Sequence, residues 1–332
     1  MKKKIFTWMK RITLGVIVLM AFFAIGGTVF EYASRTNAVS KYSAPGEFAV
    51  VGDHRLHYLK RGPLEPISPT VVFESGLDQG GHLPWTRVQL QVSEFVTTVS
   101  YDRAGVLWSE RGSNPKTGTA IAEELHELLD IINAPKPYIL VGHSLAGLTL
   151  RSFASAYPSE VSGIVFVDVS HPDQQIVIPE LKGSGLPPLW MFRILFSTGI
   201  ARLMLDRVYP ATEPDDPINE IVNAMFPGNW IGMAEENFAV QELFDEARNI
   251  DSFGDTPLAI IAGTDPERWD SAPDRIPKEK LSSAMLELQR SLLNLSTNSE
   301  LTLANESGHY VQLQQPELVV EAIRRVISKS QI

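Results

Sequence analysis

A series of short apolar runs, each followed by a segment long enough for a helix, constrains the fold of this chain most. The runs are rich in β-branched side chains and lie at residues 70–73, 97–101, 138–141, 163–167, 258–262 and 300–303. Strands that are covered by helices on both faces have such continuous apolar stretches, and helices that alternate with strands connect them in parallel. We therefore predict an α/β fold with a mostly parallel, doubly wound sheet.

The segment before these runs predicts a hairpin. Residues 48–51 and 55–59 are short β-type runs on either side of Gly52-Asp53, a pair typical of tight turns. We expect the folded domain to begin near Glu47 with this antiparallel hairpin. Its α/β core would comprise residues 47–170 and 255–332.

The interval between Asp168 and Leu258 predicts an insertion. It is much longer than the roughly dozen residues that a crossover between parallel strands needs. A loop of that length without structure of its own would be unusual. We predict that residues 171–254 form a helical cap over the core.

The amino terminus is basic and then strongly apolar. Residues 12–30 contain no charged side chain, and as a helix this run would cross the roughly 30 Å of a bilayer core. Cations precede the run: Lys2, Lys3, Lys4, Lys10 and Arg11. Because positive flanks stay inside, we expect a cytoplasmic segment at 1–11, a transmembrane anchor at 12–30, a linker at 31–46 and an extracytoplasmic remainder. A cleaved signal peptide followed by secretion is the alternative.

Composition limits the partners of the folded part. The formal net charge of −10 argues against a nucleic-acid partner, because phosphate binding requires clustered Lys and Arg. The chain has no cysteine, which excludes disulfides, thiolate zinc sites and a cysteine nucleophile. Neutral small molecules are the expected partners.

The sequence VGHSLAG at residues 141–147 indicates a nucleophile. Ser144 follows an apolar strand and precedes a helix-forming segment, and a serine on such a sharp turn projects its hydroxyl above the sheet. Small neighbours are needed there, and Gly142, Ala146 and Gly147 provide them. An ordinary strand-to-helix turn with an incidental serine is the alternative.

His309 is the expected base for Ser144. It lies in a loop after the last strand, and sites in open α/β sheets are built at the carboxyl ends of strands. His143 is expected to point away from the serine and to be structural. His171, which follows another strand, is a weaker candidate for the base.

Several carboxylates could orient His309. Asp265 follows the penultimate strand and gives the chain order Ser, Asp, His, so it is the preferred acid. Asp168, which ends the strand after the serine, is the main alternative. Glu267 and Asp270 lie in the same acidic loop as Asp265 and also remain candidates.

Two backbone N–H groups are expected to bind a developing oxyanion. Leu145 lies at the start of the helix after the nucleophile, where N–H groups are free to donate. The second donor should come from the glycine-rich loop 74–81, where Leu77 is our candidate.

Together these residues resemble the α/β-hydrolase superfamily, in its serine-nucleophile, esterase- and lipase-like branch. Residues 142–147 resemble the nucleophile elbow, YDRAG at 101–105 resembles the loop after the fourth strand, and SGH at 307–309 resembles the catalytic-histidine segment. The resemblance implies a Ser-Asp-His triad, a helical cap after the sixth strand, and neither a cofactor nor a metal. Asp265 stands two residues after Gly263, whereas the family's acid usually stands three after its glycine, so Asp168 stays open.

The expected reaction is hydrolysis of an acyl compound. A serine with a histidine base attacks an acyl carbon and forms an acyl-enzyme that water resolves. The apolar cap and the anchor favour carboxylic esters of hydrophobic small molecules. An aminopeptidase of the proline-iminopeptidase kind, with acidic cap residues such as Glu235 and Glu236 binding a free amine, is one alternative. A non-catalytic binding protein on a hydrolase scaffold is another.

Overall fold

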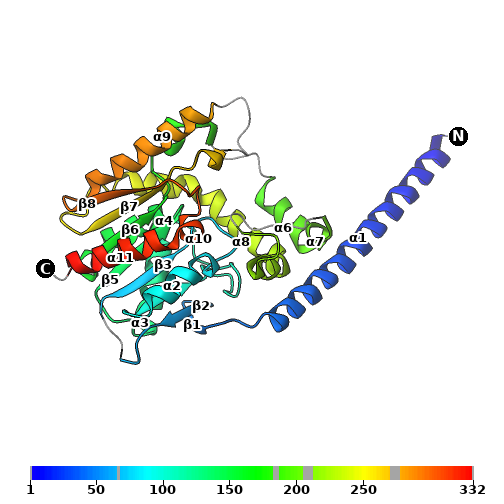
Figure 1. Cartoon of the computed structure of the whole chain (residues 1–332). Coiled ribbons are helices and arrows are strands. Elements are labelled where there is room, and N and C mark those ends of the chain that lie inside the picture. Colours follow the sequence, from blue (N-terminus) through cyan, green and yellow to red (C-terminus); the bar gives the residue numbers. More distant parts are fainter. Residues whose placement is uncertain (1, 66–67, 182–186, 205–211, 270–276, 331–332) are drawn as a thin grey trace.

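The computed structural model describes residues 2–65, 68–181, 187–204, 212–269 and 277–330. One eight-stranded sheet forms its centre, with strand order β1-β2-β4-β3-β5-β6-β7-β8 (Figure 1). The strands are β1 (Glu47–Val51), β2 (His54–Arg61), β3 (Thr70–Glu74), β4 (Thr98–Tyr101), β5 (Tyr138–His143), β6 (Val161–Val167), β7 (Leu258–Gly263) and β8 (Ser299–Ala304).

The predicted sheet is confirmed. β1 pairs with β2 and β2 with β4 in antiparallel orientation, whereas the remaining pairs of neighbouring strands, from β4 with β3 to β7 with β8, are parallel. Each of the six apolar runs lies within or overlaps a strand, and the side chains of β3, β4, β5 and β7 are buried along their whole length. Burial on both faces explains why these strands lack a polar alternation.

Helices cover both faces of the sheet (Figure 1). On one face, α3 (Gly118–Ile131) and α4 (Ala146–Ala156) pack on a core that includes Val72, Leu140 and Phe166. On the other, α2 (Thr86–Val92) and α11 (Pro316–Ser330) pack on Phe73, Val141 and Val165. The remaining core helices are α9 (Lys278–Ser291) and α10 (Val311–Gln314).

The predicted helical insertion is present between β6 and β7. Its helices are α5 (Gln174–Val177), α6 (Leu189–Ser197), α7 (Ile200–Met204) and α8 (Pro217–Arg248). Residues 182–186 and 205–211 of this insertion lie outside the described part. α8 begins where the carboxylate of Asp216 accepts a hydrogen bond from the N–H of Ile218 at 2.9 Å, an N-cap that satisfies one otherwise free donor.

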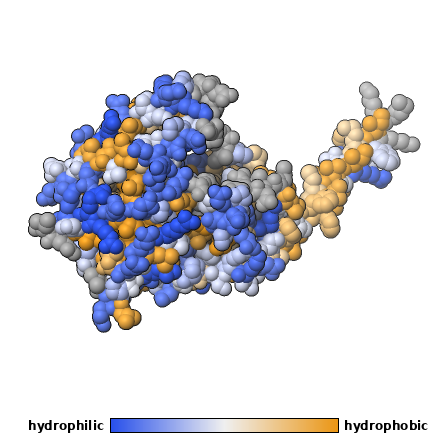
Figure 2. All heavy atoms as spheres, viewed as in Figure 1, coloured by the Kyte–Doolittle hydropathy of each residue, from blue (hydrophilic) through white to orange (hydrophobic). Residues whose placement is uncertain are grey.

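Helix α1 (Lys2–Lys41) is longer than the apolar run that predicts it. It projects from the globular part as a hydrophobic rod (Figure 2), and by length and composition it is the one described helix able to cross a membrane. The helix continues through residues 31–41 of the segment we expected to be a linker. Tertiary contacts explain the extension, because Glu31 and Ala38 are buried against the rest of the protein.

Arg202 of α7 joins α1 to the cap. Its guanidinium forms a bidentate ion pair with Glu31, with both N···O distances 2.8 Å. The same group donates to the carbonyls of Asn223 and Ala224 at 3.5 and 2.9 Å. The Asn223 carbonyl needs such a donor because Pro227, four residues later in α8, has no N–H to give it.

Candidate active site

Ser144 lies on a tight turn between β5 and α4. Its φ of +55° is in the left-handed region, a strained conformation for a residue with a side chain. The turn leaves little space, because a Cβ on Gly142 would lie 2.6 Å from Leu150 and one on Gly147 would overlap Val169. The small residues that flank the serine are therefore a steric requirement, and the buried methyl of Ala146 is accommodated.

Three side chains from three loops meet at this turn. The Oγ of Ser144 lies 3.0 Å from Nε2 of His309. On the other side of the ring, Nδ1 of His309 lies 2.6 Å from Oδ2 of Asp168. Because Asp168 can only accept, Nδ1 carries the proton and Nε2 is free to accept from the serine hydroxyl.

The Asp168 carboxylate is buried and well bound. Arg268 donates to both of its oxygens, at 3.1 and 2.7 Å, and the N–H of Gly263 donates at 3.0 Å. Burial by itself would raise the pKa of Asp168, but the charge of Arg268 and the hydrogen bond from His309 outweigh it and lower that pKa to about 2. The group therefore stays ionised at neutral pH.

Asp265, the acid preferred from the sequence, does not meet His309. Its carboxylate accepts a hydrogen bond from the N–H of Glu267 at 2.9 Å, within its own exposed turn. The structure thus brings the alternative, Asp168, to the histidine. Glu267 lines a neighbouring cavity rather than the serine's own, and Asp270 lies outside the described residues.

The segments that carry the two expected oxyanion donors lie on either side of the serine. Leu145 directly precedes α4, so its N–H belongs to the first turn, whose donors have no carbonyl within the helix. On the other side, a Cβ on Gly76 would lie 2.6 Å from Cβ of Ser144. The loop that carries Leu77 therefore passes directly beside Ser144.

This loop, residues 75–81, is held by groups that the sequence did not reveal. The buried Arg103 donates to the carbonyls of Ser75 and Gly76 and pairs with Glu236 of α8 at 2.8 Å. Asn229 of α8 donates to the carbonyl of Gln79 at 3.0 Å, and the Trp230 Nε1 donates to the Gln79 side chain at 2.7 Å. The cap helix thus fixes the loop from above, through contacts more than a hundred residues apart in the chain.

The other histidines take part in separate hydrogen bonds. Nε2 of His143 lies 2.8 Å from the backbone carbonyl of His309 and supports that loop from beneath; burial lowers the pKa of His143 to about 3. His171 contacts Ser291 and the N–H of Asp173, and it does not line the cavity that contains Ser144.

A buried cluster of His57, His82 and Asp102 has ligand atoms close enough to hold a metal ion. Nδ1 of each ring already donates to Asp102, at 2.8 and 2.9 Å. Burial opposes ionisation of Asp102, but the two histidines outweigh it and lower its pKa. We interpret the cluster as structural, because these hydrogen bonds join the three side chains to one another.

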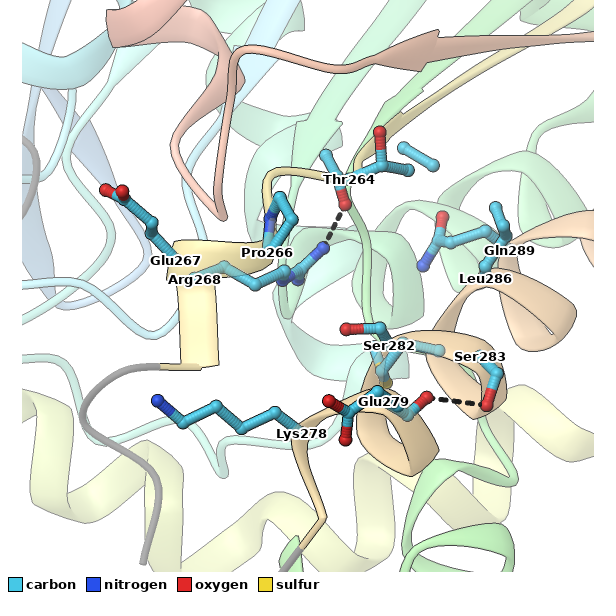
Figure 3. Close-up of a pocket in the computed structure, with 13 residues that line it drawn as sticks. Thr264, Pro266, Glu267, Arg268, Lys278, Glu279, Ser282, Ser283, Leu286 and Gln289 are labelled. Atoms are coloured by element: carbon cyan, nitrogen blue, oxygen red, sulfur yellow. Dashed lines mark hydrogen bonds between the residues drawn. The ribbon is translucent and has the colours of Figure 1, made fainter. Parts of the chain in front are cut away.

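One cavity contains the serine, and a larger cavity adjoins it. One of about 300 Å³ is lined by Ser144, Asp168 and His309 together with Gln174 of α5, Trp269 and Met285. A larger one of about 530 Å³ shares Arg268 and Met285 with it. Figure 3 shows the larger cavity between the short helix η4 (Pro266–Trp269) and α9, with Arg268 reaching across it. Met285 and Leu286 give it an apolar wall.

Comparisons with known proteins agree with this fold. The sequence model of the family described as alpha/beta hydrolase fold matches residues 69–202. An AB hydrolase superfamily protein of Gibberella zeae is 24% identical over 299 residues, which are 80% of this chain and 89% of that protein. A probable transporter of Hormonema carpetanum is 34% identical over 127 residues, 36% of this chain, but the match spans only 18% of that protein.

Among solved structures, a thermophilic esterase from Thermogutta terrifontis aligns with a TM-score of 0.58 and 18% identity. The alignment covers 86% of this chain and 97% of the esterase. At this identity the likeness concerns the fold. With the matching family model and the strand order described above, it shows that the chain has the α/β-hydrolase fold.

Proposed function

We propose that the protein is a serine hydrolase that cleaves carboxylic esters through a triad of Ser144, His309 and Asp168. The observation that carries the proposal is the chain of contacts from Oγ of Ser144 to Nε2 of His309 and from Nδ1 of His309 to Asp168, at 3.0 and 2.6 Å. The positive φ of Ser144 supports it, because strained residues cluster where a side chain must be presented for chemistry.

In the proposed reaction His309 takes the proton of the Ser144 hydroxyl as Oγ attacks the acyl carbon. The N–H groups of Leu77 and Leu145 stabilise the oxyanion of the tetrahedral intermediate. Asp168 holds the imidazole tautomer and stabilises the imidazolium. His309 then protonates the departing alcohol, and water activated by the same histidine hydrolyses the acyl-enzyme.

The surroundings of the site favour an ester with an apolar portion. Val169, Trp269 and Met285 line the serine's cavity. The thermophilic esterase from Thermogutta terrifontis shares the fold, which is compatible with this substrate class.

The contacts of acidic cap residues do not favour an aminopeptidase. Such an enzyme needs a free carboxylate to bind the amine of its substrate. Glu236 is buried and paired with Arg103, and Glu235 is paired with Arg193 at 2.8 Å. Glu246 accepts a hydrogen bond from the N–H of Thr119 at 2.9 Å. These carboxylates are therefore engaged within the protein.

We also propose that α1 anchors the protein in the cell membrane, with the hydrolase domain on the extracytoplasmic side. The basic residues at the start of α1 and its apolar run support this orientation. Contacts between residues 27–41 of α1 and the cap favour an uncleaved anchor over a signal peptide, because cleavage within them would remove buried side chains such as Glu31 and Ala38.

The test is a comparison of the protein with its Ser144→Ala variant. We expect the protein to hydrolyse p-nitrophenyl esters and to react covalently with a fluorophosphonate probe. Ser144→Ala should lose both properties and keep its thermal unfolding temperature. Ester turnover that persists in the variant would contradict the proposal. Absence of both labelling and turnover in the protein itself would instead favour a binding role.

A further inference from the structure

Helices α6 and α7 present an unusual outer surface. Trp190, Ile194 and Leu203 are 64, 56 and 76% exposed. The opposite side of α6 is apolar too, since Phe192 and Phe196 are buried and Phe196 stacks on Trp230 of α8, with ring centroids 5.7 Å apart. A helix that is apolar on both sides is not expected to face water.

The charged side chains of these two helices are neutralised. Arg193 pairs with Glu235 and Arg202 pairs with Glu31, each at 2.8 Å. Each arginine of these two helices is therefore paired with a carboxylate, next to the exposed aromatic and aliphatic side chains. This combination fits an environment of low polarity better than bulk water.

The contact with α1 places this surface along the anchor. The backbone at Thr198 packs so closely on Gly27 that a side chain there would clash, and Gly199 lies against Phe30. Residues 27–30 are the last turn of the uncharged run, and Glu31 is its first charged residue. At about 1.5 Å per residue, Gly27 lies roughly 5–6 Å deeper than Glu31 along the helix.

From this arrangement we propose that the exposed apolar face of α6 and α7 lies in the headgroup region of the phospholipid bilayer that α1 spans. The proposal rests on the proposed anchor. If residues 12–30 cross the bilayer, the contact at Gly27 brings the turn between α6 and α7 to the outer boundary of the hydrocarbon. Apolar faces of interfacial helices sink about 5–10 Å into that boundary, and tryptophan is enriched there. Figure 2 shows that the hydrophobic surface of α1 continues to the point where the helix meets the globular part.

The absence of cysteine from the sequence allows a direct test. Single variants Leu203→Cys, Leu64→Cys and Leu19→Cys of the full chain would carry a spin label, and the protein would be reconstituted in phosphatidylcholine vesicles. Leu64 is a matched control, fully exposed just after the end of β2 and beside Lys60 and Thr97. Accessibility to oxygen, which partitions into lipid, and to a water-soluble nickel chelate would be measured for each label.

We expect the label at position 203 to be more accessible to oxygen than to the nickel chelate, and the label at 64 to show the reverse. If the label at 203 behaves like that at 64 while the label at 19 lies in lipid, the inference is wrong and the anchor stands. If the label at 19 is also in water, the anchor itself fails. If the label at position 203 is protected from both agents and its spectrum is broadened by a nearby second label, a second copy of the chain covers this face. That result would also overturn the inference.

Discussion

The carboxylate of Asp168 lies 2.6 Å from Nδ1 of His309, although 141 residues separate the two in the chain. Asp265 is much closer to His309 in sequence, but its carboxylate bonds within its own turn. The two aspartates therefore offer a direct comparison. We expect Asp168→Asn to lower kcat by about 10³- to 10⁴-fold, as loss of the tautomer-holding carboxylate does in serine proteases.

The matched variant is Asp265→Asn, which should change ester turnover by less than about threefold, because surface substitutions away from special contacts have small effects. Steady-state kinetics with one soluble ester measure both variants. A large loss in Asp265→Asn with little loss in Asp168→Asn would reverse the assignment of the acid.

The hydrogen bonds from α8 to the loop at residues 75–81 predict that a substitution in the cap lowers kcat. Asn229→Ala removes the donor to the Gln79 carbonyl and the acceptor of the Leu107 N–H. Each bond contributes about 0.5–1.5 kcal/mol, so kcat should fall by up to about tenfold as the loop carrying Leu77 loosens, with a smaller change in KM.

Asn249→Ala is the control, because Asn249 is exposed at the end of the same helix and its side chain donates to the carbonyl of Asp245, one turn earlier. Equal kcat values for the two variants, at matched folded fractions, would show that the hydrogen bonds of Asn229 do not act on the reaction.

Glu74 predicts a pH dependence of stability. This buried carboxylate shares Arg103 with Glu236. Burial raises its pKa, which the charge of Arg103 only partly offsets, to about 7. Between the ordinary carboxyl value of about 4.5 and this raised value, the unfolded chain ionises more readily than the folded protein.

The contribution of Glu74 to the free energy of unfolding should therefore fall as pH rises from about 5 to 7, by an amount on the order of 1–3 kcal/mol, whereas His143, whose pKa is lowered by burial, contributes in the opposite direction. Glu74→Gln should remove the falling contribution, so that the free energy of unfolding of the variant rises more with pH than that of the parent protein, and denaturant titrations in detergent at several pH values would measure the difference. A variant with the same slope as the parent protein would mean that another group carries the pH dependence.

The contacts of α1 predict that its second half belongs to the hydrolase domain. Deletion of residues 2–41 removes Glu31, Arg35 and Ala38, which leaves Arg202 without its carboxylate and uncovers Gly228 of α8. We expect a lower thermal unfolding temperature, by several degrees for a loss of about 1–3 kcal/mol, and reduced turnover of a soluble ester in detergent.

Deletion of residues 2–24 should leave both properties unchanged, since it keeps every residue of α1 from Gly27 onward. If the longer deletion were equally harmless, the docked half of α1 would be no part of the folded unit.

The sequence predicts the sheet and two of the three polar residues at the turn because their signals are local. Burial on both faces makes each strand a continuous apolar run, and the crowded turn at Ser144 requires its small neighbours. For the third residue the sequence favours Asp265 over Asp168, whereas the structure brings Asp168 to His309, because both aspartates follow strands and differ only in where their loops direct the side chain. Arg268, which holds Asp168, gave no signal of its own.

The cap contacts could not be predicted for a related reason. Arg103 meets Glu236 across 133 residues, and Asn229 meets Gln79 across 150. Polar residues of this kind look like solvent-exposed helix positions until the fold brings their partners to them. The same holds for residues 31–41, which are helical because the cap covers one side of them.

Three consecutive residues of α8 contact both α1 and the loop beside Ser144. Gly228 lies under the guanidinium of Arg35 in α1, whereas Asn229 and Trp230 hold the loop beside Ser144. Substitutions at the centre of this helix would therefore disturb the contact with α1, the loop beside Ser144, or both. Side chains of α5 and α9 line the cavities and contact neither α1 nor the loop at residues 75–81, so we expect a change of substrate range that keeps this architecture to arise there.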